Sequence, residues 1–179
     1  MTGSKWPTLL CLFAIAAFGS ATTARAGRGG SSAVRAAALM SLMQAKGLHT
    51  FAVRVPDQPG QFAAVMAFPE VQLLVVAARH AQPDVLAAQV AQKQFSDVYS
   101  ELQSATTQDS RTFFQDLGGD GLGGGGGVDV MYERGVQTLF DGNWKRAKLS
   151  RETYDSRLAA ADKRYSELLD ALIDGLKAL

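Results

Sequence analysis

The spacing of hydrophobic and polar residues predicts a helix near the start of the folded part of the chain. Apolar side chains recur at steps of three and four over residues 33–46, a spacing that places them on one face of an α-helix. Ser31 or Ser32 can cap its first turn, and Gly47 stands where helices often end with glycine. The first element is therefore predicted to be an amphipathic helix.

The period of the pattern then changes from helical to two. Residues 50–55 and 61–68 alternate between apolar and other side chains, whereas residues 71–79 are nearly continuous in apolar residues. Turn-forming residues at 56–60 and 69–70 separate these three segments. We therefore expect an antiparallel meander of three strands, with the third strand covered on both faces.

The second half of the chain repeats this order. Pro83 suits the first turn of a helix that extends to about Ser104, and residues 111–117 are typical of a short strand. Two alternating segments, 128–132 and 136–140, predict a hairpin. The expected fold is thus α+β, with an antiparallel sheet of five or six strands and three helices.

The last helix has the clearest pattern. It begins after Ser150, which can cap it, and could extend to Leu179. So long an apolar stripe needs a sheet, another helix or a partner subunit to cover it. Burial within the chain is the favoured outcome, and a homodimer or protein partner is the alternative. The candidate partner face comprises Tyr154, Leu158, Tyr165, Leu169, Leu172 and Leu176.

The first residues have the composition of a cleavable signal peptide. Lys5 precedes an uncharged apolar run over residues 9–18, and Ala24-Arg25-Ala26 supplies a small-x-small cleavage site. The run is shorter than the roughly 20 residues of a membrane span, and no later stretch is long enough for one. We expect a periplasmic or secreted protein with three parts: signal peptide 1–26, flexible leader 27–32, and a single α+β domain over 33–179.

Removal of the signal peptide changes the chemistry open to the chain. The only cysteine, Cys11, lies within it, so disulfides, thiolate nucleophiles and cysteine-ligated metals are excluded from the remainder. The remainder has 16 basic and 17 acidic residues. Nucleic-acid binding usually requires a strong basic excess, so we expect no nucleic-acid partner.

A glycine-rich loop over residues 118–127 contains the most suggestive motif. Residues 119–124 match G-x-G-x-x-G, but a strand pattern follows where the phosphate-binding motif requires a helix. Asp116, Asp120 and Asp129 have ligand types suitable for calcium, although an EF-hand would need more oxygen ligands. A flexible connection is the favoured interpretation, and no metal site is predicted.

The sequence has no recognisable catalytic constellation. His49 and His80 lack neighbours at metal-ligand spacing, and no G-x-S-x-G nucleophile elbow is present. Arg54, Arg79 and Arg111 could each meet a cofactor phosphate, but nothing distinguishes them. No catalytic residue is therefore assigned, and the cofactor-binding residues and the cofactor stay unknown.

Aromatic residues on the predicted strands could line one pocket instead of filling a core. In outline the predicted fold is similar to the flavin-binding split barrels related to pyridoxamine phosphate oxidase, although no motif supports the likeness. The first hypothesis is an exported binding or interaction protein without catalytic activity, and its ligand is unknown. The alternative is a flavin- or other cofactor-binding oxidoreductase. The candidate pocket residues are Phe51, Phe62, Phe68, Phe113, Phe114, Tyr132 and Phe140.

Overall fold

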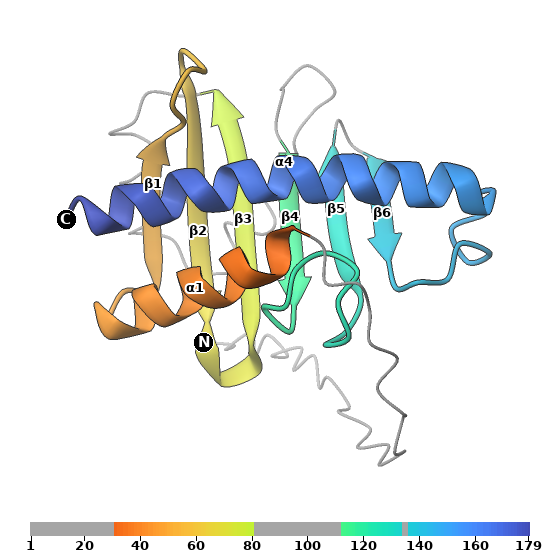
Figure 1. Ribbon diagram of the computed structural model, residues 1–179, viewed down its shortest axis with the longest axis horizontal. Helices are drawn as coiled ribbons and strands as arrows, with labels where there is room; N and C mark the ends of the chain where they lie inside the picture. Colours follow the sequence, from red (N-terminus) through yellow and green to blue (C-terminus); the bar gives the residue numbers. More distant parts are fainter. Residues whose placement is uncertain (1–30, 81–111, 134–135) are drawn as a thin grey trace, which may run out of the picture.

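The computed structural model describes residues 31–80, 112–133 and 136–179, which form an α+β structure (Figure 1). The described residues contain two α-helices, six strands and one short 3-10 helix. In chain order these are α1 (Ser32–Ala45), β1 (Thr50–Arg54), β2 (Gln61–Phe68), η1 (Pro69–Val71), β3 (Leu73–His80), β4 (Thr112–Leu117), β5 (Asp129–Glu133), β6 (Val136–Phe140) and α4 (Arg151–Lys177). The helix expected over residues 83–104 and the signal peptide lie outside the described residues.

The six strands form one antiparallel sheet in the order β1-β2-β3-β4-β5-β6. Each strand pairs with its neighbours in sequence, as the predicted meander and hairpin require. The β2–β3 connection is tight because η1 is followed by Gln72, whose φ of 50° reverses the chain. β1 and β6 are the two edges of the sheet, so the described strands form an open sheet and not a closed barrel.

Both α-helices lie on the same face of the sheet (Figure 1). α4 crosses all six strands and is about 40 Å long at 1.5 Å per residue, since it has 27 residues. α1 has 14 residues and lies beside the part of α4 that leads to the C-terminus. α1 is therefore too short to accompany α4 over its whole length, and the first turns of α4 lie over β5 and β6 without it.

The apolar stripe of α4 is buried within the chain. Tyr165, Leu169, Leu172 and Leu176 are fully buried, and they pack in one core with α1 and with the helix-facing side chains of the sheet. At about 25 cal/mol per Å² of apolar surface removed from water, such a stripe is a major contribution to stability. Leu158 is the one residue of the candidate partner face that is only partly buried.

The opposite face of the sheet is also buried in its centre. Phe62, Ala64 and Met66 of β2 contact Val75 of β3 and Phe113 of β4 in a second apolar cluster. Both faces of β3 are therefore covered, as its nearly continuous apolar sequence predicts.

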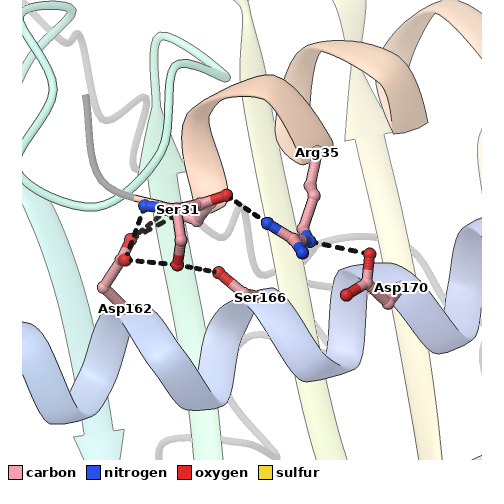
Figure 2. Close-up of polar contacts among 6 residues, drawn as sticks. Ser31, Arg35, Asp162, Ser166 and Asp170 are labelled. Carbon is pink, nitrogen blue, oxygen red and sulfur yellow. Dashed lines mark hydrogen bonds and ion pairs between the residues drawn. The ribbon is translucent and has the colours of Figure 1, made fainter.

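The N-terminus of α1 is held by α4, in a way that differs from the predicted cap. Ser31 is the N-cap residue, but its side chain makes no capping bond within α1. Instead, the Asp162 carboxylate on α4 accepts bonds from the backbone N–H groups of Ser31 at 2.8 Å and Ser32 at 3.3 Å (Figure 2). An acidic side chain at this position satisfies unpaired N–H groups and the positive end of the helix dipole. The cap thus comes from another helix.

Further polar contacts fix the α1–α4 pair (Figure 2). The Ser31 and Ser32 hydroxyls both donate to Asp162, and the Ser31 hydroxyl also bonds the Ser166 hydroxyl at 2.8 Å. One turn further along, Arg35 Nε donates to Asp170 at 2.7 Å. The serines predicted to cap a helix therefore bind one helix to another.

Candidate functional site

A groove lies between the N-terminal half of α4 and the β5–β6 hairpin. Its floor contains two cross-strand pairs, Met131 with Thr138 and Glu133 with Val136. Its volume is about 640 Å³, which is within the range of small-molecule sites. The wall formed by α4 comprises Arg157, Ala160, Ala161, Lys163, Arg164 and Glu167.

The groove is on the flank of α4 turned away from α1. Residues 157, 160, 164 and 167 recur at steps of three and four, which places them on one side of the helix. Residues 162, 166 and 170, which bind α1, are on the other side. The buried stripe lies between the two flanks. α1 covers one side of α4, and no other helix of the described residues covers the groove on the other side.

Arg164 lines the groove and has a buried polar atom that no contact within the described fold satisfies. Its Nε atom is buried and has no hydrogen-bond partner. Glu133 and Glu167 also line the groove, but neither forms an ion pair with Arg164 in the described part of the chain. A buried guanidinium N–H without an acceptor is unusual because its lost hydration is not replaced.

A second, smaller hollow of about 220 Å³ continues from the groove along the edge strand β6. Thr138 and Arg157 line both cavities. Arg146 lines the smaller one and forms an ion pair with Asp141 at 2.9 Å, so its charge is already matched. Arg157, which lines both cavities, forms no ion pair among the described residues.

The glycine-rich loop packs on the other flank of α4. The backbone N–H of Leu122 donates to the Ser32 hydroxyl at 3.1 Å, which joins the loop to the α1–α4 contact. Gly121 has a φ of +84°, and a Cβ there would lie 2.6 Å from the Ala33 nitrogen. Only glycine fits this close approach. The loop connects two strands, as expected, but it is a packed connection and not an open one.

Two buried aspartates hold the loop from inside. Asp116 accepts bonds from the N–H groups of Asp120 at 3.2 Å and Gly121 at 3.1 Å. Asp129 accepts bonds from the N–H groups of Leu117 at 2.9 Å and Gly123 at 2.7 Å. Both carboxyl groups are fully buried, so these bonds replace the water they lose.

Burial makes these carboxyl groups weak acids. Burial, and after it the neighbouring Asp116 charge, raises the pKa of Asp129 to about 7. Burial also raises the pKa of Asp116, although hydrogen bonds from the Tyr165 hydroxyl, at 3.0 Å, and from Gly121 oppose this. Burial places the pKa of Tyr165 well above its usual value. Tyr165 therefore remains the hydrogen donor of this cluster at neutral pH.

The calcium hypothesis receives no support from this geometry. All four carboxylate oxygens of Asp116 and Asp129 accept backbone N–H bonds. Asp120 accepts one from Gly126 at 2.9 Å, and its other oxygen is buried without a partner. Among the described residues, no group of three or more His, Cys, Asp or Glu side chains could hold a metal ion. Here the acidic side chains bind the loop backbone.

The aromatic residues do not line one pocket. Phe51, Phe114 and Phe140 pack on the helix-bearing face of the sheet, whereas Phe62, Phe68, Phe113 and Tyr132 belong to the opposite face. The hypothesis of a shared aromatic pocket is therefore wrong, because the alternation of the strands separates its members.

Two of the remaining candidates, His49 and Arg54, are not among the residues that line the groove. His49 is exposed just before β1. The Arg54 guanidinium lies 5.4 Å from the centre of the Phe62 ring, so its charge already has an aromatic contact. The side chains of Arg79 and His80, and Arg111 as a whole, lie outside the described residues.

The groove was not found by sequence reasoning, although one signal was present. The first predicted helix has about half the length of the last, so the first helix alone cannot cover the whole of the last one. Which flank stays open depends on how α4 is rotated on the sheet. That rotation is a tertiary property, which periodicity alone does not give.

No protein-family model, curated protein or solved structure matches this chain. None of the helices in residues 31–80, 112–133 and 136–179 is long and apolar enough to cross a membrane. The function must therefore be inferred from the groove and its surroundings.

Proposed function

We propose that this chain is an exported, non-catalytic binding protein whose ligand occupies the groove between α4 and the β5–β6 hairpin. The observation that carries the proposal is the buried, unpartnered Nε of Arg164 in a groove of about 640 Å³. Elsewhere on α4, Asp162, Ser166 and Asp170 all have partners. A polar group left without a partner in one cavity favours a role in binding.

Several features support binding over catalysis. The described residues that line the groove include cationic and acidic side chains but no histidine, serine or cysteine, so no Ser-His or Cys-His pair is formed there. Export follows from the signal-like first residues, and it places the ligand in the periplasm or outside the cell. A partner bound by the apolar stripe of α4 is less favoured, because that stripe already packs within the chain.

Native mass spectrometry of the protein purified from a cell extract tests the proposal. Ala160 lines the groove, so Ala160→Trp should fill it. Ala159→Trp introduces the same side chain one residue earlier, at an exposed position outside the groove. We expect the wild type and Ala159→Trp to carry the same additional mass, and Ala160→Trp to lose it.

Two results would contradict this proposal. The bare mass in all three proteins would mean that the groove holds no ligand under these conditions of growth. An additional mass with a flavin-like absorption band, unaffected by Ala160→Trp, would favour the alternative oxidoreductase function.

A further inference from the structure

The groove has apolar side chains on both walls and cations on the wall formed by α4. Met131 and Val136 line it from the strands, and Ala160 and Ala161 line it from α4, so a nonpolar group in the groove would contact carbon on both sides. Arg164 lies on the α4 wall and is partly buried, and its Nε atom is buried without a hydrogen-bond partner among the described residues. Carbon on both walls beside a guanidinium without an ion pair in that part of the chain is complementary to a molecule that has a nonpolar chain and one anionic group.

The charges that line the groove limit the number of negative charges on that molecule. Arg157, Lys163 and Arg164 are cationic, and Glu133 and Glu167 are acidic, so the lining has a formal charge of +1. The small positive charge of the lining suits a monoanion, and the two glutamates oppose the binding of a polyanion. The lining therefore favours one negative charge over several.

The geometry of guanidinium favours a carboxylate. Arginine presents parallel N–H donors that fit the two oxygens of a carboxylate, and such bonds are stronger where water is excluded. The Nε–H of Arg164 is a donor of this kind that still lacks an acceptor. A carboxylate there would satisfy the donor and neutralise the charge together.

We infer that the ligand of the groove is a single-chain aliphatic carboxylate, with its carboxylate on Arg164 and its chain along Met131, Val136 and the alanines of α4. This inference rests on the proposed binding function, and it names the class of ligand. Each methylene group of the chain that is buried in the groove strengthens binding, because apolar surface is removed from water. The head group fixes orientation, and the chain supplies much of the affinity.

Isothermal titration calorimetry at pH 7 with decanoate and decanol tests the inference. The protein is purified after expression of the full chain, freed of bound lipid, and titrated with each compound below its aggregation concentration. We expect decanoate to bind the wild type at least about tenfold more tightly than decanol, because only decanoate can pair with Arg164.

Substitutions at Arg164 separate the effect of its charge on binding from the effect of its paired N–H donors. Arg164→Gln should weaken decanoate binding about tenfold or more and leave decanol binding unchanged. The affinity of Arg164→Lys for decanoate should lie between those of the wild type and Arg164→Gln, because lysine keeps the charge but lacks the paired donors. Lys177→Gln is the matched control, since Lys177 is an exposed cation in the last turn of α4 and should not affect either compound. Thermal unfolding of each variant shows whether it is folded.

The outcomes distinguish this inference from the function on which it rests. Equal affinity of decanoate and decanol, or of the wild type and a folded Arg164→Gln for decanoate, would overturn the assignment of a carboxylate. If decanoate does not bind while the mass adduct disappears in Ala160→Trp, the ligand class is wrong but the binding function stands. If decanoate does not bind and no adduct is found, the ligand class and the proposed binding function are both wrong.

Discussion

The two flanks of α4 differ in whether their buried polar groups have hydrogen-bond partners. On the flank that faces α1, Asp162 accepts bonds from Ser31 and Ser32, and Asp170 pairs with Arg35. On the groove flank, Arg164 has no partner for its buried Nε. Paired polar groups stabilise the fold, whereas an unpaired one costs stability and therefore needs another reason to be there. The polar groups of the first flank stabilise the fold, whereas the groove flank keeps one buried donor without a partner among the described residues.

The largest effect is expected at Gly121, where the loop meets α1. Gly121→Ala should lower the free energy of unfolding by roughly 3 kcal/mol, because the positive φ and the contact with Ala33 leave no room for a Cβ. Equilibrium urea denaturation measures this difference. Gly125→Ala is the control, since a Cβ there meets nothing within 4 Å and should change stability by less than about 0.5 kcal/mol. Equal losses of stability in Gly121→Ala and Gly125→Ala would contradict the close packing of the loop against α1.

Asp162→Ala tests the cap that α4 provides for α1. It removes the acceptor of two backbone N–H groups and two hydroxyls, so stability should fall by about 2 to 3 kcal/mol. The same denaturation experiment measures it, with Asp174→Ala as the control because Asp174 is exposed on the same helix. If both variants have the stability of the wild type, the polar contacts of this flank do not stabilise the fold.

The buried carboxyl groups predict that stability depends on pH. The pKa of Asp129 is about 7 in the folded chain and has its ordinary value of 3.8 when unfolded, so the folded state retains a proton that the unfolded state loses. The stabilisation is complete below pH 4 and disappears as the pH rises through about 7. We expect the free energy of unfolding to be lower at pH 8 than at pH 5, by about 2 kcal/mol.

Asp129→Asn identifies the group responsible, because the amide does not titrate. Its absolute stability will also change, since one of its atoms becomes a donor that faces a backbone N–H. The decisive quantity is therefore the difference between pH 5 and pH 8 within each protein. An Asp129→Asn variant with the same pH dependence as the wild type would show that another group titrates.

The smallest effect on stability is expected in the groove. Arg164→Met should leave the unliganded protein unchanged or stabilise it by up to about 1 kcal/mol, because methionine keeps the apolar contacts and removes the unsatisfied donor. Arg35→Met, on the other flank, should lower stability because Arg35 bonds Asp170 and the Ser31 carbonyl. Urea denaturation compares the two. A clear loss of stability in Arg164→Met would remove the contrast between the flanks.

Much of the sheet and the last helix could be predicted from the sequence. Alternation with a period of two located four of the strands, a nearly continuous apolar run located β3, and turn chemistry supplied the antiparallel order. Ser150 caps α4 as expected, with the Thr153 N–H donating to its hydroxyl at 3.1 Å. These features depend on neighbouring residues, so a local pattern is sufficient to predict them.

The polar contacts could not be predicted in this way. Asp162 lies about 130 positions from the serines that it binds, and no local pattern indicates that a helix will be capped by another helix. Asp116 and Asp129 were interpreted as possible calcium ligands, because residue type alone does not distinguish an oxygen that binds a cation from one that binds backbone N–H groups. The groove depends on the same long-range arrangement.

The joining of the first and last helices has a consequence for the order of folding. Every strand pairs with its neighbour in sequence, so the sheet can form progressively as the chain is synthesised. The helical layer cannot, because α1 is held by residues of α4 that follow it more than 130 positions later in the chain. Until α4 is complete, one face of the sheet exposes its apolar side chains. A protein made in this order is vulnerable to aggregation late in synthesis, and truncation within α4 would prolong that state.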